Sequence, residues 1–196
     1  MWGSDKREVN KTLITWYVGC TGSGKTTLAL QDLQEDIKKN KHPALVIDSQ
    51  GVKLLSGIRH ARSWQETARI VWKKKKNCAF IPTDKEQVSN LFAVAREIGF
   101  TNCLLDEGGF WMSSRSIERS GELALRTHLH TDLNLRITTQ NIADLAPIAL
   151  QCTSRIKTFR CTSPRTLKRL SEEFGYKPEE IEKLERGQFI EKGMGF

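Results

Sequence analysis

A glycine-rich run near the start of the chain has the residue types and spacing of a phosphate-binding loop. Residues 19–26 read Gly-Cys-Thr-Gly-Ser-Gly-Lys-Thr, a full match to the pattern GxxxxGK[ST]. Glycines let the backbone wrap closely around phosphates, so that successive N–H groups and the N-terminus of the next helix face the anion. Lys25 is expected to reach the β- and γ-phosphates of ATP, and the Thr26 hydroxyl to coordinate Mg²⁺. The predicted nucleotide-binding residues are Gly19, Thr21, Gly22, Ser23, Gly24, Lys25, Thr26 and Thr27.

Two adjacent acids, Asp106 and Glu107, follow a short apolar run at Cys103–Leu105. This pattern is typical of a Walker B strand, which we expect beside the strand that enters the phosphate-binding loop. Asp106 is expected to hold Mg²⁺ through its water shell, and Glu107 to polarise the water that attacks the γ-phosphate. An isolated Asp-Glu pair is more often a solvated strand end, but the loop upstream favours catalysis. The glutamate also favours hydrolysis over phosphoryl transfer to a small acceptor.

A further strand is predicted from Leu133 to Thr139, and it ends in the polar amide of Gln140. This glutamine is a candidate sensor of the γ-phosphate. The alternative for an isolated strand-end glutamine is an ordinary hydrogen bond within a loop.

Strands and helices alternate along the whole sequence. Apolar runs predict strands at 13–18, 44–47, 78–81, 103–105, 133–139, 156–159 and 188–190, and helical spacing predicts helices at about 26–39, 64–74, 85–98, 116–128, 164–174 and 178–184. This alternation predicts the α/β class: a mostly parallel central sheet with helices on both faces and ligands at the carboxyl ends of the strands, as in P-loop NTPases. Residues 1–10 are expected to form a flexible N-terminal arm, and residues 11–196 a single ATPase domain.

Composition limits the class of protein and its partners. The chain has 196 residues, of which 38% are hydrophobic, which is enough for one sizeable core. No stretch approaches the roughly 18 consecutive apolar residues of a membrane span, so we expect a soluble, intracellular protein with reduced cysteines. The net charge of +8 fits a polyanionic partner. The run Lys73 to Lys76 is read first as a solvated helix end and second as a nucleic-acid contact, and both can hold.

The order of these motifs carries a family resemblance. A phosphate-binding loop, an Asp-Glu pair about 80 residues on and a Thr-Gln strand end about 33 residues later resemble the FtsK–HerA superfamily of DNA-pumping ATPases, whose core is RecA-like. The size, the segment 141–147 and the ending Leu-Glu-Arg-Gly-Gln-Phe-Ile at 184–190 are most similar to the genome-packaging ATPases of icosahedral viruses with an internal membrane. The resemblance spans residues 13–190.

The resemblance implies a set of partners and a location. Such proteins assemble as homo-oligomeric rings, here a hexamer or a pentamer, that translocate double-stranded DNA. It also implies association with a capsid or portal vertex protein. The expected location is the cytoplasm of the host cell, or the virion.

An arginine finger from the neighbouring subunit is implied as well, to stabilise charge on the γ-phosphate. Relatives commonly carry it about eleven residues before the glutamine, where this chain has Leu129. Arg126 lies one helical turn upstream and is favoured, whereas Arg115 and Arg119 are rivals. An ordinary surface arginine is the alternative for each.

The segment after the acids departs from the family pattern. Gly108 and Gly109 predict a mobile turn, and Phe110 and Trp111 follow directly. Core packing is the expected role of both aromatic residues, and contact with a neighbouring subunit or DNA is the alternative.

Two other functions stay open. One is a soluble phage-assembly or secretion ATPase of the Zot-like type, which acts on protein; such motors tend to carry a transmembrane segment after the ATPase core, and none is recognisable here. The other is a small-molecule or nucleoside kinase, which usually has an arginine-rich lid and does not need the second acid of the Asp-Glu pair. The balance favours a DNA translocase.

Overall fold

A single sheet organises the residues that the computed structural model describes, which are 13–49, 51, 58–98, 101–113, 117–131 and 133–194. The sheet has eight strands in the order β3-β4-β2-β5-β6-β1-β7-β8, and every neighbouring pair is parallel except β7 and β8. The prediction of a mostly parallel α/β sheet is confirmed. The strands are β1 (Ile14–Val18), β2 (Ala44–Ile47), β3 (Arg59–Ala61), β4 (Cys78–Phe80), β5 (Thr101–Leu105), β6 (Leu133–Thr139), β7 (Arg155–Phe159) and β8 (Phe189–Gly193).

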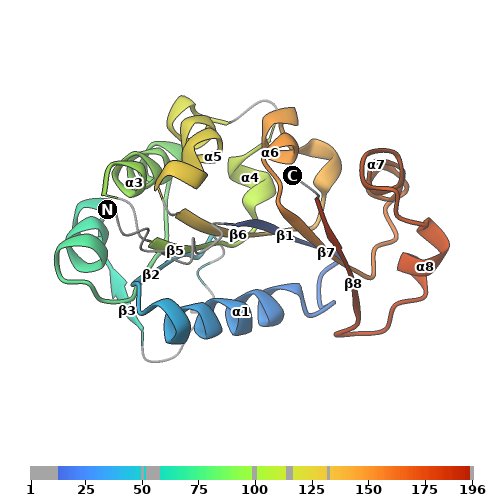
Figure 1. Ribbon diagram of the computed structural model, residues 1–196, viewed down its shortest axis with the longest axis horizontal. Helices are drawn as coiled ribbons and strands as arrows, with labels where there is room; N and C mark the ends of the chain where they lie inside the picture. Colours follow the sequence, from blue (N-terminus) through green and yellow to red (C-terminus); the bar gives the residue numbers. More distant parts are fainter. Residues whose placement is uncertain are drawn as a thin grey trace, which may run out of the picture.

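Helices cover both faces of the sheet, as predicted (Figure 1). Helix α1 runs across one face, and α3, α4, α5 and α6 lie on the other, while α7 and α8 lie beyond β8 (Figure 1). No helix in the described ranges is long and apolar enough to cross a bilayer. The helices are α1 (Lys25–Asn40), α2 (Trp64–Ala68), which continues as the π-helical η1 (Arg69–Lys73), α3 (Lys85–Ile98), α4 (Gly108–Trp111), α5 (Arg119–Thr131), the 3₁₀ turn η2 (Ile142–Asp144), α6 (Pro147–Gln151), α7 (Pro164–Phe174) and α8 (Pro178–Glu182).

The buried central strands explain why apolar runs, rather than alternating patterns, mark this sheet. In β1 all five residues are buried. Trp16 faces the core under α3 to α6, whereas the next residue, Tyr17, packs with Ala29 and Leu33 of α1. Two hydrophobic cores therefore pack against β1 from opposite sides. They fix the position of the strand that leads into the phosphate-binding loop.

Charged side chains also fasten α1 to the sheet. Asp32 accepts hydrogen bonds from Tyr17 Oη at 2.6 Å and from Lys157 Nζ at 2.5 Å, and Asp36 pairs with Arg136. Burial raises the pKa of the Tyr17 hydroxyl, and the hydrogen bond to Asp32 adds to that shift. Lys157 and Arg136 are buried while the two acids are partly exposed, so removing an acid leaves a buried positive charge without its partner. The set therefore holds α1 against β1, β6 and β7.

Strand order corrects one prediction. The Walker B strand β5 does not lie beside β1, because β6 pairs in parallel with both strands and separates them. A sequence pattern identifies strands but does not encode which strands become neighbours. The consequence is that Gln140, at the end of β6, lies between the phosphate-binding loop and the two acids.

Other differences concern short elements. Neither β3 nor α6 was predicted: β3 is a three-residue strand at the sheet edge, and α6 has only five residues, the first of which is Pro147. Helix α5 extends to Thr131, beyond the expected end at residue 128. The predicted arm at residues 1–10 lies outside the described residues.

The glycine pair after the acids forms a helix rather than a turn, so the prediction of a turn is wrong. A Cβ at Gly108 would overlap Ile137 Cγ2 of β6, and a Cβ at Gly109 would lie 2.7 Å from Thr139 Oγ1. Only glycine lets α4 pack this closely on β6. Core packing is correct for Trp111, which is 6% exposed, and wrong for Phe110, which is 64% exposed.

We expect Gly108→Ala to lower the free energy of unfolding by about 1–3 kcal/mol, because the added methyl group overpacks the contact between α4 and β6. Urea unfolding followed by circular dichroism measures this change. Gly121→Ala, within α5, is the matched control, since a Cβ there meets Ile117 Cγ1, just before the helix, at an ordinary 3.8 Å. That variant should gain up to about 1 kcal/mol from helix propensity. Equal effects of the two substitutions would contradict tight packing at Gly108.

Candidate functional site

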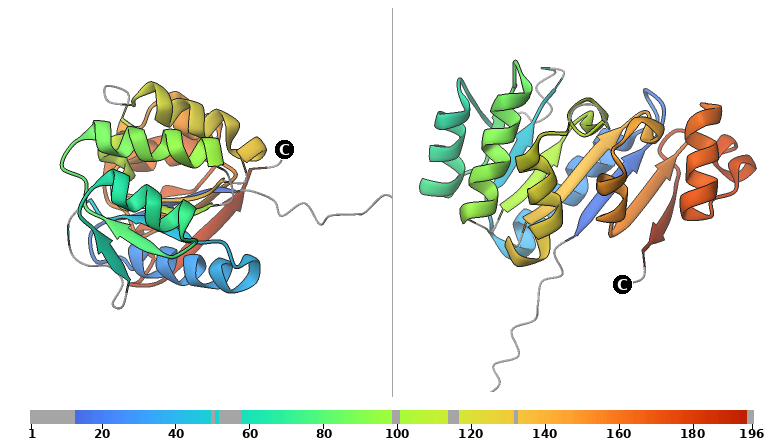
Figure 2. Two further views of the ribbon diagram at one scale, coloured as in Figure 1. Left: turned by 90° about the vertical axis from the view of Figure 1, so that its left-hand side faces the viewer. Right: turned by 90° about the horizontal axis from the view of Figure 1, so that it is seen from above.

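The carboxyl ends of the parallel strands bring the predicted site residues to one edge of the sheet. In the right-hand view of Figure 2, β1, β6 and β7 point the same way. The phosphate-binding loop follows β1, Asp106 and Glu107 follow β5, and Gln140 follows β6. Residues that are far apart in the sequence therefore meet at this edge, as expected for parallel α/β sheets.

The loop's backbone needs its glycines. Gly22 has φ of 76° and Gly24 has φ of 101°, a region that side chains disfavour. A Cβ at Gly19 would lie 2.7 Å from Phe159 Cβ and 2.8 Å from Ser23 Oγ, so that position has no room for a side chain. Gly24 also caps α1 without a side-chain hydrogen bond, which leaves the first N–H groups of this 16-residue helix facing the loop. Such a helix end favours an anion.

Distant segments brace the loop from outside. Cys20 N donates to Arg160 O at 3.0 Å, and Gly187 N donates to Ser23 O at 2.9 Å. A Cβ at Gly24 would lie 3.3 Å from Gly187 Cα, so the turn before β8 rests directly on the loop. These contacts tie two backbone groups of the loop to the segments after β7 and before β8.

A chain of polar contacts joins the loop to the catalytic candidates. Lys25 Nζ lies 3.3 Å from Glu107 Oε1, and Gln140 Nε2 donates to the same oxygen at 3.1 Å. Thr21 Oγ1 in turn donates to Gln140 Oε1 at 3.0 Å. The structure thus brings together four predicted residues from the loop, α1, β5 and β6. Thr27 is exposed in the first turn of α1 and is outside this chain of contacts.

The predicted metal ligands also meet. Thr26 Oγ1 donates to Asp106 Oδ1 at 3.2 Å, and Thr138 Oγ1 donates to the same oxygen at 2.7 Å. Burial raises the pKa of the Asp106 carboxyl and Glu107 adds to it, whereas the two hydrogen bonds and the Lys25 charge act in the opposite direction. Hydroxyl and carboxylate oxygens are the ligands that Mg²⁺ prefers, so this donor set fits the ion.

Thr138 was given no role in the sequence analysis, yet it organises both acids. It is fully buried, and besides donating to Asp106 it accepts a hydrogen bond from Glu107 N at 2.9 Å. Glu107 has a left-handed backbone with φ of 49°, which costs a non-glycine residue about 1–2 kcal/mol. Thr138 therefore stabilises the strained turn that aims the Glu107 carboxylate at Lys25. The only sequence signal was a hydroxyl residue within a buried strand.

A second pair missed by the sequence analysis supports the same turn. Ser49, just after β2, donates its hydroxyl to Asp106 O at 2.5 Å, and Trp111 Nε1 donates to Ser49 Oγ at 2.6 Å. The buried face of α4 is thereby tied to the backbone that carries the acids. Because the partners come from three segments, no local pattern in the sequence indicates this contact.

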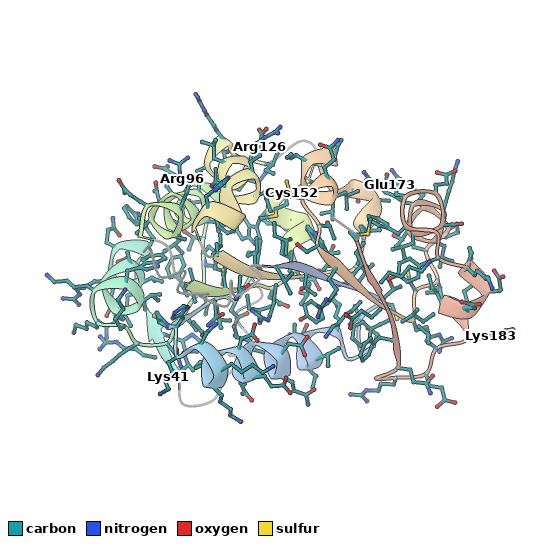
Figure 3. The ribbon with its side chains drawn as sticks, in the orientation of Figure 1. Lys41, Arg96, Arg126, Cys152, Glu173 and Lys183 are labelled. Atoms are coloured by element: carbon teal, nitrogen blue, oxygen red, sulfur yellow. The ribbon has the colours of Figure 1, made fainter. Side chains whose placement is uncertain are left out.

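The two described arginine candidates take no part in these contacts. Arg126 lies on the outer surface of α5, as Figure 3 shows, and its guanidinium pairs with Glu122 at 2.9 Å. Arg119 is exposed at the start of α5, and Arg115 lies outside the described residues. A finger acts on the site of a neighbouring subunit, so Arg126 stays a prediction.

The parallel sheet, the glycine loop ahead of α1 and the acids at the end of β5 define the fold of a P-loop NTPase. Neither a protein-family model nor a curated protein matches the chain. Solved structures do match the chain. The genome-packaging NTPase B204 of Sulfolobus turreted icosahedral virus 2 in complex with ATP-gammaS has a TM-score of 0.78 and 21% identity, covering 94% of this chain and 93% of that one. Its complex with sulfate has a TM-score of 0.79, 21% identity, and coverage of 94% and 92%.

A more distant similarity is to the N-terminal domain of zonular occludens toxin from Neisseria meningitidis. Its TM-score is 0.51 at 14% identity, with 79% of this chain and 78% of that chain covered. At these identities the likeness concerns the fold. The architecture implied by the resemblance in the sequence is therefore present, over almost the whole length of B204.

We expect Thr138→Val to lower the rate of ATP hydrolysis by about tenfold or more and the free energy of unfolding by about 1–3 kcal/mol, because Glu107 N loses its acceptor and Asp106 a donor. Steady-state phosphate release and urea unfolding measure the two effects. Thr138→Ser keeps the hydroxyl and should restore most of the activity. A fully active Thr138→Val variant would contradict the positioning role.

Proposed function

We propose that this chain is an ATP-hydrolysing motor that translocates double-stranded DNA into a preformed viral capsid. The observation that carries the hydrolytic part is the shared oxygen Glu107 Oε1, which lies within 3.3 Å of Lys25 Nζ and accepts from Gln140 Nε2 at 3.1 Å. A phosphate-binding lysine, a candidate base and a candidate sensor thus converge on one point.

The arrangement supports a division of labour among these side chains. The backbone N–H groups of the loop and Lys25 would hold the β- and γ-phosphates, while Thr26 and Asp106 would hold Mg²⁺, which neutralises the charge that develops on the phosphates. Glu107 would exchange its contact with Lys25 for a water molecule and orient that water toward the γ-phosphate. Gln140 already contacts both Thr21 and Glu107. It would sense the departure of the γ-phosphate and transmit the change to β6.

The fold and the charge support DNA as the substrate. B204, which shares the fold over 94% of this chain, is described as a genome-packaging NTPase, and its structures contain ATP-gammaS, AMP and AMPPCP. The net charge of +8 suits a phosphate backbone. We propose a homo-oligomeric ring in which Arg126 reaches a neighbour's γ-phosphate, and which works at a capsid or portal vertex in the host cytoplasm or the virion.

A protein substrate is the second candidate. The zonular occludens toxin domain shares the fold, which keeps open a phage-assembly or secretion ATPase. The packaging function is preferred because the likeness to B204 covers more of both chains at a higher TM-score. Nucleoside kinase activity is disfavoured, because the side chain of Glu107 is held beside Lys25, where a hydrolytic water is needed.

We expect Glu107→Gln to keep ATP affinity and to lower hydrolysis by about 10²- to 10⁴-fold, because it removes the base and leaves the phosphate-binding groups in place. Lys25→Ala should weaken ATP binding by about tenfold or more, because the variant lacks the ammonium group that pairs with the phosphates. Equilibrium binding of a fluorescent ATP analogue and phosphate release separate the two effects. Residual hydrolysis in Glu107→Gln equal to that of the unmodified protein would remove Glu107 as the base.

We expect double-stranded DNA to raise the rate of ATP hydrolysis several-fold, because assembly around the substrate brings each finger to its neighbour's site. Phosphate release with and without linear duplex DNA measures this, and native mass spectrometry gives the number of subunits. Arg126→Ala should lose the stimulation and keep nucleotide binding. Phosphate transfer to a nucleoside, with turnover insensitive to DNA, would establish the kinase instead.

A further inference from the structure

Seven lysines gather near the amino ends of the strands, on the side of the sheet opposite to the nucleotide site. They occupy the last turn and C-cap of α1 and the end of η1 with the turn that follows it. All seven are exposed, and none forms an ion pair with another described side chain. We call this surface the lysine edge: Lys38, Lys39, Lys41, Lys73, Lys74, Lys75 and Lys76.

The two halves of the lysine edge are adjacent in space. The chain runs from one half into β2 and from the other into β4, and these strands are parallel neighbours with Leu45 opposite Cys78. Ala44 N also donates to Asn77 Oδ1 at 2.9 Å, which joins the two segments directly. Because neighbouring strands lie about 5 Å apart, the backbone segments that carry the two halves enter the sheet side by side. One extended polyanion can therefore contact both halves.

Buried amides hold the backbone of this edge. Asn102, fully buried on β5, exchanges two hydrogen bonds with Asn40 at 3.1 and 3.2 Å. Asn102 also donates to His42 O at 3.2 Å, and Asn40 Oδ1 accepts from His42 N at 2.9 Å. The segment that carries Lys38 to Lys41 is thus fixed to the sheet, so the charges project from a rigid base.

Two positions of the lysine edge, which we call its corners, have a backbone conformation that is unfavourable for lysine. Lys41 has φ of 56° and Lys75 has φ of 53°, the left-handed conformation that favours glycine or asparagine. Lysine at either corner lowers stability relative to glycine. Among the described residues the third non-glycine residue of this kind is Glu107, at the nucleotide site. Backbone strain of this sort is typical of functional positions. At the lysine edge, two turns whose conformation favours glycine carry a positively charged residue instead.

We propose that the lysine edge binds the phosphate backbone of double-stranded DNA; this rests on the proposed translocase function and names its substrate-binding surface. Lysine ammonium groups act as point charges that neutralise phosphates and do not read base edges, so binding is independent of sequence. Helix α1 connects this surface to catalysis, since its 16 residues begin at Lys25 and end at Asn40. That is about 24 Å of helix between the bound phosphates of ATP and those of DNA.

The test compares two fourfold charge-neutralised variants of the full chain. One replaces Lys73 to Lys76 by Gln, and the control replaces Arg165, Lys168, Lys177 and Lys183 by Gln, which removes the same charge near α7 and α8. Figure 3 shows Lys41, of the lysine edge, and Lys183, of the control set, on opposite sides of the molecule. Fluorescence anisotropy with a labelled duplex is recorded over a range of salt concentrations, and phosphate release is recorded without DNA.

For the Lys73 to Lys76 variant we expect affinity for the duplex to fall about tenfold or more at about 0.1 M salt, because fewer phosphates are neutralised. The dependence of log K on log salt should become shallower by about 0.9 for each phosphate that the variant leaves unpaired. The control should retain most of the affinity and the slope. Hydrolysis without DNA should be unchanged in both variants.

A second variant, Lys41→Gly with Lys75→Gly, separates charge from structure. Its midpoint of urea unfolding should equal or exceed that of the unmodified protein, because glycine suits both corners, while its affinity for the duplex falls. A purely structural role would leave DNA affinity unchanged, and that result would overturn the proposal.

Three further outcomes would also overturn it. If the unmodified protein binds DNA and is stimulated by it, but the Lys73 to Lys76 variant behaves as the control does, the surface is wrong and the translocase function stands. If the unmodified protein neither binds DNA nor responds to it, the proposed function fails and the surface with it. Weaker binding to phosphatidylserine vesicles with unchanged DNA affinity would assign the lysine edge to a membrane.

Discussion

The position of β6 between β1 and β5 is the constraint on which the site depends. Were β5 paired directly with β1, the end of β6 would lie elsewhere and Gln140 could not contact both Thr21 and Glu107. Thr138, two residues earlier on the same strand, bonds to both acids. One strand therefore leads to the group that links the phosphate-binding loop to Glu107 and supplies the group that holds the turn at Glu107, and both require the order that the sheet has.

Several contacts converge on the strained turn at Glu107. Its left-handed backbone would relax without support, and the support comes from Thr138 on β6, Ser49 after β2 and Trp111 on α4. The glycines that begin α4 allow the helix to approach β6 closely enough for the Trp111 indole to reach Ser49. Packing on the helical face thus determines the direction of a carboxylate at the strand end.

Local patterns were sufficient to predict much of this molecule. The loop from Gly19 to Thr26 was evident because its glycines are needed for backbone reasons, and the acids at 106 and 107 because they end an apolar run. Strand order was predicted wrongly, since β5 and β1 are recognisable individually but their partner strand is chosen by packing. Sequence patterns did not predict the roles of Thr138, Ser49 and Trp111, because each of them acts through a residue distant in sequence. Phe110 and Trp111 look alike in sequence, yet α4 exposes one and buries the other.

The hydrogen bond from Gly187 N to Ser23 O has a consequence for synthesis of the protein. The phosphate-binding loop lies near the start of the chain, but β1 pairs with β6 and β7, and the loop itself rests on the turn before β8. During translation the loop gains its partners in steps: first Thr139 and Gln140 at the end of β6, then Arg160 after β7, and last Gly187. The shape of the phosphate-binding loop is therefore a property of the finished sheet, and a chain truncated before residue 187 lacks part of the support for that loop.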